Sequence, residues 1–514
     1  MANADPNKAF LESIQKGYPE DGDCLYLGAA MLAGEVLSEA AIQLPLKNFN
    51  RHGLIAGATG TGKTKTLQIV AEQLSRLGVP SLVMDIKGDL SGLGAAGTAE
   101  DFIVKRHAKL GVKYEPGASP LEFLSLSDEP GARLRATITE FGPILMSRIL
   151  DLNETQTGVL SVVFKFCDDS GLLLLDLKDL KKAVHFVANE GADDIAAEYG
   201  SISKSSASTI LRKIVALEQQ GAEHFFGEQS YEIDDLLRCD KDGRGIISVV
   251  RLTDMQSKPA LFSTFMLQLF AEAYERLPEE GDLAKPKLCI FIDEAHLVFK
   301  NASRALLEQI EVMVKLIRSK GVGIYFITQN PTDVPGPVLS QLGLKVQHAL
   351  RAFTAKDRRA IKQTAENFPL SKFYETDRVL TEMGIGEALV TGLGPKGRPT
   401  PLAWTYMRAP ASRMDVLSEA EIQKILKASA ILKKYNQVID RESAYEILTA
   451  KIEALESNAG EAATKKASKK KASGRKEKST LEKVLDSSAA RQVGRTLARE
   501  ITRGLLGVIG IKRR

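Results

Sequence analysis

Apolar residues along much of this chain alternate between short strand-like runs and longer amphipathic stretches. From Gly53 a short apolar run is followed by a Gly-rich turn, an amphipathic stretch and a second apolar run. The strands predicted from this pattern are 54–56, 81–86, 245–252, 287–292, 323–328, 346–350 and 387–390, and the helices are 63–77, 259–276 and 303–319. The run 287–292 is apolar throughout, which is typical of a central strand covered on both faces. This alternation predicts an α/β fold with a mostly parallel sheet.

Two regions depart from the alternation. Residues 131–240 carry mostly helical patterns, as in 132–150, 153–166 and 205–219, and predict a helical insertion. The apolar stretches 25–32 and 42–46 predict small strands that lead into the core. The predicted organisation is a strand-rich segment 1–50, the α/β core in 51–130 and 241–410, the insertion 131–240, a helical segment 411–458, a disordered Lys/Ala/Ser-rich linker 459–479 and a basic amphipathic helix 480–514.

Composition narrows the class of protein. A chain of 514 residues predicts two or three folded units. No apolar run reaches the roughly 18–20 residues that span a bilayer, and the first residues lack a secretion-signal pattern, so we expect a cytoplasmic protein. Four scattered cysteines favour reduced thiols over disulfides or a zinc site. The net charge is only +4 and the basic excess lies in the last fifty residues, so binding of nucleic acid has to depend on local patches.

The turn after the first core strand matches the phosphate-binding pattern G-x-x-x-x-G-K-[ST] in full. Its glycines let backbone N–H groups point at phosphate oxygens, and the following helix adds its positive end. Lys63 is predicted to reach the β- and γ-phosphates, and the Thr64 hydroxyl to coordinate Mg²⁺. The predicted ATP-binding residues are Gly57, Ala58, Thr59, Gly60, Thr61, Gly62, Lys63, Thr64 and Lys65. A Gly-rich turn without a ligand is the weaker alternative.

Two acidic residues end the most apolar strand. Asp293 is predicted to hold Mg²⁺, and Glu294 to orient and deprotonate the attacking water. Gln329, after the next strand, is predicted to contact the γ-phosphate or the water, the alternative being a polar strand cap before Pro331. Asp85 ends the strand after the phosphate-binding helix, where it can support Mg²⁺ or serve an ordinary turn.

An ATPase that works as a ring often completes its site with an arginine from a neighbouring subunit. Arg318 is the first candidate for that residue and Arg351 the second, while Arg358 and Arg359 are weaker candidates. For each of them the alternative is a surface salt bridge.

Five motifs in order carry a family resemblance: RHGLIAGATGTGKT, MDIKGDL, KPKLCIFIDEAHLVF, IRSKGVGIYFITQNP and QLGLKVQHALRAFTAKD. The chain from roughly 25 to 410, and again at REITRGLLG in the tail, resembles the HerA-like branch of the HerA/FtsK superfamily, and more narrowly the bacterial HerA-like helicases.

The resemblance implies a RecA-like core of the ASCE class that hydrolyses ATP at subunit interfaces, often as a hexameric ring that pumps double-stranded DNA. It places Lys63 and Thr64 in the Walker A element and Asp293 and Glu294 in Walker B. Gln329 then corresponds to a sensor, and Arg318 lies near the expected trans-acting arginine. Archaeal HerA proteins begin with a β-barrel that docks a nuclease, and fifty residues are too few for a full one, which weighs against a nuclease partner and against the usual ring geometry.

The end of the chain carries a separate amphipathic pattern. Arginines recur every fourth residue on one ridge, and apolar residues with the same spacing lie on the opposite face. The two sets are Arg491, Arg495, Arg499 and Arg503, and Val493, Leu497, Ile501 and Leu505. Such a helix can lie on an anionic membrane, pack on a partner or neighbouring subunit, contact DNA, or dock on its own domain.

Three functions therefore compete. The leading one is a DNA-dependent motor ATPase that needs ATP and Mg²⁺. The second is an ATPase that assembles or remodels proteins, at a membrane surface through 480–514. The third treats ATP as a structural ligand, and Glu294 argues against it because a water-priming acid suits turnover.

Overall fold

A twelve-stranded sheet organises the first of two units in the computed structural model, which describes residues 6–254, 258–281, 283–300, 304–394 and 397–468. This unit comprises Met1–Arg133, Glu232–Pro259 and Glu272–Lys434. Its strands run in the order β2-β1-β12-β11-β10-β3-β9-β8-β4-β7-β5-β6. Their bounds are β1 Cys24–Leu32, β2 Glu35–Pro45, β3 Gly53–Ala56, β4 Ser81–Asp85, β5 Leu121–Ser125, β6 Ala132–Arg133, β7 Ile247–Arg251, β8 Leu288–Ile292, β9 Val322–Thr328, β10 Leu344–His348, β11 Glu387–Thr391 and β12 Ala403–Met407.

From β10 to β6 every neighbouring pair of strands is parallel. The strands β3, β4, β8 and β9 are buried along their whole length, because helices cover both faces of a parallel sheet. β9 separates β3 from β8, so the strand before the Gly-rich turn and the strand before Asp293 are not neighbours. An extra strand at this place is the arrangement expected of the ASCE class, and the predicted mostly parallel α/β core is confirmed.

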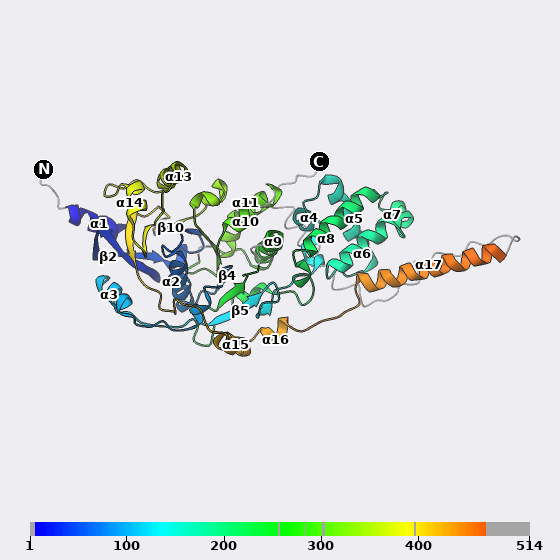
Figure 1. Cartoon of the computed structure of the whole chain (residues 1–514), viewed down its shortest axis with the longest axis horizontal. Coiled ribbons are helices and arrows are strands. Elements are labelled where there is room, and N and C mark those ends of the chain that lie inside the picture. Colours follow the sequence, from blue (N-terminus) through cyan, green and yellow to red (C-terminus); the bar gives the residue numbers. More distant parts are fainter. Residues whose placement is uncertain (1–5, 255–257, 282, 301–303, 395–396, 469–514) are drawn as a thin grey trace. The chain divides into compact units, whose positions relative to one another are not determined.

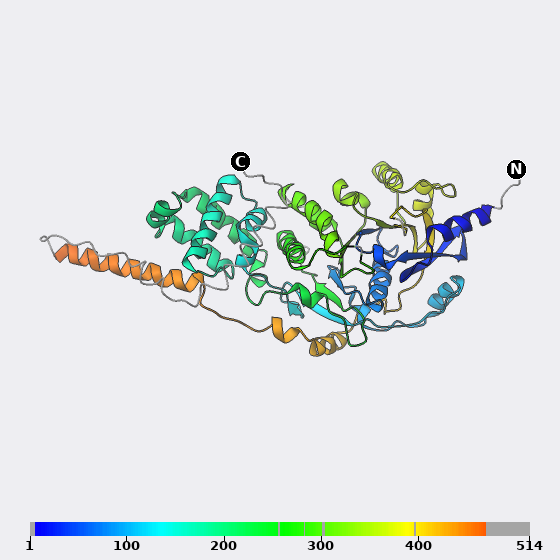
Figure 2. The same cartoon turned by 180° about the vertical axis from the view of Figure 1, so that it is seen from behind.

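The N-terminal residues do more than lead into the core. β1 and β2 form an antiparallel hairpin, and β1 pairs with β12, so the hairpin closes one edge of the same sheet. Figures 1 and 2 show this hairpin beyond β10 and far from β5. The helix α1 (Pro6–Gly17) buries Phe10 and Ile14 against the core that the hairpin shares.

Helices cover the sheet of the first unit. Besides α1, they are α2 Lys63–Arg76, α3 Asp101–Lys109, α10 His296–Lys300, α11 Arg304–Ile317, α12 Gly336–Leu339, α13 Ala355–Glu366, α14 Thr376–Glu382, α15 Glu419–Ala428 and, at the boundary of the unit, α16 Leu432–Tyr435. α2 follows the Gly-rich turn directly, and Leu67, Val70 and Leu74 on it are fully buried. The apolar face of α2 therefore fixes the turn against the sheet.

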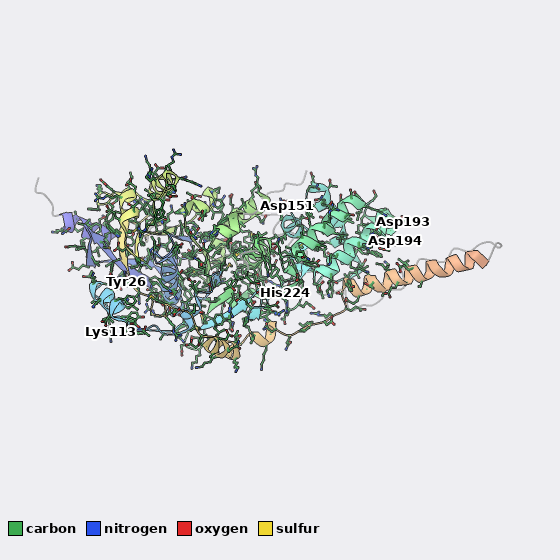
Figure 3. All side chains as sticks on the ribbon, viewed as in Figure 1. Tyr26, Lys113, Asp151, Asp193, Asp194 and His224 are labelled. Atoms are coloured by element: carbon green, nitrogen blue, oxygen red, sulfur yellow. The ribbon has the colours of Figure 1, made fainter. Side chains whose placement is uncertain are left out.

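The second unit is helical and comprises Leu134–Tyr231, Ala260–Ala271 and Tyr435–Arg514. Its helices are α4 Ile138–Ile149, α5 Glu154–Ser170, α6 Leu177–Ala188, α7 Ala192–Glu198, α8 Lys204–Glu218, the middle of α9 Pro259–Arg276, and α17 Ala444–Ser468. α17 is tied to α6 at its start, where Asp179 accepts hydrogen bonds from the Ser443 hydroxyl and the Tyr445 amide at 2.6 and 2.8 Å. Asp151, Asp193 and Asp194 of this unit are labelled in Figure 3.

Two features qualify the organisation expected for the C-terminal part. α17 continues to Ser468, so the first ten residues of the expected linker 459–479 are helical. The rest of that linker and the amphipathic helix expected at 480–514 lie outside the described residues. Among the helices that the structure describes, none is long and apolar enough to cross a membrane.

Candidate functional site

The Gly-rich turn Gly57–Thr64 connects β3 to α2 and has the backbone of a phosphate-binding loop. Gly57, Gly60 and Gly62 have φ angles of 150°, 77° and 121°, a region that side chains rarely adopt. A Cβ on Gly57 would lie 2.5 Å from the Cβ of His348, so glycine is also required there by space. Lys63 Nζ donates to the carbonyls of Gly57 and Ala58 at 2.8 and 3.0 Å, which places its ammonium over the loop.

Backbone hydrogen bonds join the ends of three strands around this loop. The Gly57 amide donates to Thr328 O of β9 at 3.3 Å, and the Ala58 amide donates to Ala349 O after β10 at 2.9 Å. On the other side of β9, the Ala295 amide donates to Ile327 O at 2.8 Å. The predicted Walker A and Walker B residues therefore meet at the carboxyl edge of the sheet, where ligands bind in such folds.

Asp293 and Glu294 follow β8 directly and are buried, with exposed fractions of 2% and 5%. Glu294 has a φ of 47°, a conformation that costs a non-glycine residue energy and is often found at functional sites. Its carboxylate forms an ion pair with Lys87, and His296 Nδ1 lies 3.1 Å from its Oε2. Although burial favours neutral lysine, the pairing with Glu294 and the nearby Asp293 raise the pKa of Lys87.

The electrostatics around Asp293 suit a cation. Burial raises the pKa of Asp293 to about 7; Lys87 opposes this effect and Glu294 adds to it. Its Oδ2 is buried without a hydrogen-bond partner among the described residues, as is Oδ1 of Asp89. The Thr64 hydroxyl lies 3.4 Å from Asp89 Oδ2. Orphaned carboxylate oxygens beside a hydroxyl are the hard oxygen ligands that Mg²⁺ prefers, so the residues present fit this ion.

Asp85 ends β4 as predicted, and its carboxylate is bound by the backbone of the turn that follows. Its Oδ1 accepts from the Gly88 and Asp89 amides at 2.7 and 3.2 Å, and its Oδ2 accepts from Leu90 N at 3.1 Å. Burial raises its pKa to about 6 despite these hydrogen bonds. Of the two roles left open by the sequence, these contacts favour the turn, and the turn positions Asp89 beside Thr64.

Gln329 directly follows β9 at the same edge of the sheet and is exposed. It lines an open cleft of about 640 Å³ together with His296, Phe299 and Asn330. Because His296 also contacts Glu294, the cleft connects the predicted sensor to the predicted base. The backbone beside Gln329 is held by Asp333, whose Oδ2 accepts from the Asn330 amide at 3.2 Å.

Lys87, Asp89, His296 and His348 belong to the site, and sequence reasoning did not assign any of them a role. His348 is fully buried beneath the loop, with Nδ1 2.8 Å from Glu387 O and Nε2 2.8 Å from the Thr66 hydroxyl. Because a carbonyl only accepts, Nδ1 donates and Nε2 accepts the Thr66 proton. Burial lowers the pKa of His348 to about 4, so the ring stays neutral.

A comparison with known families matches the whole of this site. The profile described as "Helicase HerA-like C-terminal" covers residues 31–514. The chain belongs to the HerA-like C-terminal family. The predicted resemblance is confirmed, and the chain is a P-loop ATPase of the HerA/FtsK type.

Curated relatives of this HerA-like chain are themselves named as HerA proteins or as a probable helicase. The DNA double-strand break repair helicase HerA of Saccharolobus solfataricus is 24% identical over 76% of this chain and 70% of its own length. The protein of the same name in Sulfurisphaera tokodaii is 22% identical over 69% of this chain and 65% of its own length. A probable helicase of Methanocaldococcus jannaschii is 23% identical over 70% of this chain and 67% of its own length. The chain thus spans about two thirds of the length of these relatives.

Solved structures show the same fold. The plasmid coupling protein TrwB, in complexes with non-hydrolysable ATP and GTP analogues, superposes on the HerA-like chain with a TM-score of 0.50 in each case. The identities are 16% and 15%, and each alignment covers 79% of this chain and 95% of TrwB. The likeness to TrwB shows the fold alone.

The candidate arginines of the HerA-like chain lie at opposite edges of the sheet. Arg318 is exposed and starts the 3₁₀ turn before β9, so it lies at the amino edge of the strand whose other end meets the loop. A seven-residue strand spans about 20 Å, so Arg318 is remote from the ATP site of its own chain. Arg351 follows β10 at the carboxyl edge, and its Nη1 donates to Thr381 O at 3.3 Å. Arg358 and Arg359 are exposed on α13.

Lys65 is the predicted ATP-binding residue whose side chain points elsewhere. Its Nζ donates to the carbonyl of Met414, so only its backbone amide remains available to a phosphate. The other predicted loop residues precede or begin α2, at its positive end.

Proposed function

We propose that this HerA-like chain hydrolyses ATP with Mg²⁺ and uses the cycle to move along double-stranded DNA. The observation that carries hydrolysis is the position of Glu294. This buried carboxylate lies one strand away from the phosphate-binding loop, beside Lys87 and an aspartate with an orphaned oxygen. A binding module needs the loop but has no use for a buried acid held in a strained conformation beside it.

The residues divide the reaction between them. Loop amides and Lys63 bind the β- and γ-phosphates and neutralise their charge. Thr64 and Asp293 would hold Mg²⁺, which supplies charge stabilisation on the phosphate oxygens. Glu294 accepts a proton from water as the water oxygen bonds to the γ-phosphorus, and the bond from that phosphorus to the bridging oxygen breaks to leave ADP and phosphate. Gln329 faces the cleft in which that phosphate is released.

Lys87 connects the base to the phosphates. Its ammonium pairs with Glu294 and lies close enough to Lys63 to lower the pKa of that lysine, after burial, the larger cause. A cation in this position orients Glu294 before the reaction and can stabilise the charge that develops on the γ-phosphate.

DNA is proposed as the track because of the family and the relatives that this chain resembles. Curated relatives that carry a name in DNA repair align with most of this chain, and the matching family model is described as helicase-like. The same resemblance implies a homo-oligomer, a hexamer in this family. Such an assembly would bring Arg318 of one subunit to the ATP site of the next. The described residues offer no observation that favours protein remodelling at a membrane instead.

Steady-state ATP hydrolysis by the full chain, with and without double-stranded DNA, tests both parts. Glu294→Gln keeps size and polarity but cannot take the proton, so it is the control. We expect hydrolysis that DNA stimulates and that the variant lacks. A rate of hydrolysis that DNA does not change at low salt would refute DNA as the track. Equal rates for wild type and Glu294→Gln would refute Glu294 as the base.

A further inference from the structure

The first unit contains a second hollow, a partly open cavity of about 390 Å³ at the far end of α2. α2 begins at the phosphate-binding loop with Lys63 and ends with Arg76, which lines the cavity. At a rise of about 1.5 Å per residue, a helix of this length separates the two places by about 20 Å. The cavity is therefore distinct from the ATP site, and its lining includes Arg408, Lys113 and Tyr26. Figure 3 labels the last two of these residues.

Arg408 is the main reason to regard the cavity as a binding site. Its side chain is half-buried, and burial lowers its pKa. The one hydrogen bond that its guanidinium makes to the described residues runs from Nε to Ala409 O at 3.3 Å. Its two terminal nitrogens, with four N–H donors, are left for whatever enters the cavity. A half-buried arginine without a carboxylate partner within ion-pair distance is costly unless a ligand supplies the anion.

Further cations converge on the same space. Arg76 is close enough to lower the pKa of Arg408 by like-charge repulsion, a cost that an anion between them would remove. Lys113 is exposed at the rim, and in the part of the chain that the structure describes neither Arg76 nor Lys113 has an ion-pair partner.

The lining contains two acidic residues, and the buried one, Glu72, is committed to other groups. Glu72, less than a tenth exposed, accepts from the Ala411 and Ser412 amides at 2.8 and 3.0 Å, and from the Ser412 hydroxyl at 3.0 Å. It attracts Arg408 through space without forming a contact. Arg244 is neutralised by Asp240 at 2.8 Å and does not count toward the free positive charge. Glu115 lies exposed at the rim.

We propose that this cavity is a second anion site that binds a phosphate-bearing ligand through Arg408, Arg76 and Lys113. Three cations that line one cavity, and for which the described residues supply no ion-pair partner, match a dianion or trianion better than a single carboxylate. The fork of a guanidinium binds phosphate oxygens in pairs. The phosphate can come from a free nucleotide or pyrophosphate, or from the backbone of a nucleic acid. This inference goes beyond the proposed function, because it requires neither hydrolysis nor movement.

Calorimetric titration of pyrophosphate into the full chain tests the site, in a Lys63→Ala background that weakens binding at the phosphate-binding loop. In this background we expect Arg408→Gln to weaken pyrophosphate binding at least about tenfold, the usual consequence of removing one charged hydrogen-bonding partner. Arg76→Gln and Lys113→Gln change exposed residues, so the fold tolerates them, and each should weaken binding by about threefold or more. Lys424→Gln on the exposed face of α15 is the matched control and should leave the affinity unchanged.

A second titration with a short DNA duplex identifies the source of the phosphate. Loss of both pyrophosphate and duplex affinity in the same three variants would assign the site to backbone phosphates. Loss of pyrophosphate affinity alone would assign it to a free anion. If neither probe loses affinity in Arg76→Gln, Lys113→Gln or a folded Arg408→Gln, the proposal is wrong, whatever the rate of ATP hydrolysis.

Discussion

Replacing Asp293 by asparagine should make the protein more stable, although it removes a residue of the ATP site. Burial raises the pKa of Asp293 from its usual 3.8 to about 7. The folded chain therefore holds the proton more tightly than the unfolded chain does. The stability associated with the neutral carboxyl is fully present below pH 3.8 and is lost as the pH rises through 7.

The size of the effect follows from the pKa. Each pH unit between the two pKa values corresponds to about 1.4 kcal/mol, so ionised Asp293 costs the fold roughly 4 kcal/mol above pH 7. Asn keeps the shape without the charge. For a unit of roughly 300 residues, 4 kcal/mol corresponds to a rise in Tm of about 6 °C. At pH 5 the pH has passed only part of the interval between the two pKa values. The rise in Tm at pH 5 should therefore be less than half as large as above pH 7.

Scanning calorimetry without nucleotide at pH 5 and pH 8 measures this difference. The pH profile of the wild type alone is not enough, because burial also lowers the pKa values of His52 and His348 to about 4. Their contribution is lost as the pH falls from 6.5 towards 4, opposite in sense to that of Asp293. The two histidines contribute equally to the stability of the variant and of the wild type. Their contribution therefore cancels when the two Tm values are compared at one pH.

Asp128→Asn, at an aspartate whose side chain is 75% exposed, is the control and should leave the Tm almost unchanged. Mg²⁺ with ATP should raise the Tm of the wild type, and Asp293→Asn should lose most of that increase. A variant no more stable than wild type at pH 8, or one stabilised equally at both pH values, would refute the reasoning.

The remaining predictions concern the loop, the base and the arginine. Gly57→Ala should prevent ATP from raising the Tm and should lower stability more than Gly60→Ala, because only the first places a Cβ within 3 Å of His348; equal losses would show that backbone strain alone matters. Glu294→Gln should lower the rate of hydrolysis by about 10²–10⁴-fold while ATP still raises the Tm, and loss of that increase would indicate a binding role instead. Arg318→Ala should be inactive alone but regain activity when mixed with Glu294→Gln subunits, since one interface in the mixture is then complete; no recovery would argue against an arginine acting in trans.

Local patterns predicted much of the core. The helix expected at 63–77 is Lys63–Arg76, and the strand expected at 287–292 is Leu288–Ile292, because continuous burial leaves little choice of residue type. For the hairpin β1–β2 the local pattern predicts only small strands, because its place at the edge of the sheet depends on pairing with β12, nearly 400 residues away. Sequence periodicity contains no information about a partner at that distance.

The same distinction separates the parts of the site. The loop and the acids of Walker B have local signatures, whereas His348 joins the site only because β10 pairs with β3. For Asp85 the sequence leaves a role at Mg²⁺ and an ordinary turn equally open, and it assigns Asp89 no role. In the turn after Asp85 the amides of residues 88–90 take both of its oxygens, whereas Asp89 keeps an Oδ1 without a partner among the described residues and has its Oδ2 beside the Thr64 hydroxyl.

The ATP loop and Arg318 lie at opposite edges of one sheet, and this fixes the symmetry available to an assembly that uses both. A contact between the carboxyl edge of one copy and the amino edge of the next has different surfaces on its two sides. Such a heterologous contact cannot close as a two-fold pair, and its repetition gives a ring or a helical filament. Each copy would then take part in two interfaces, donating an arginine to one and receiving an arginine at the other.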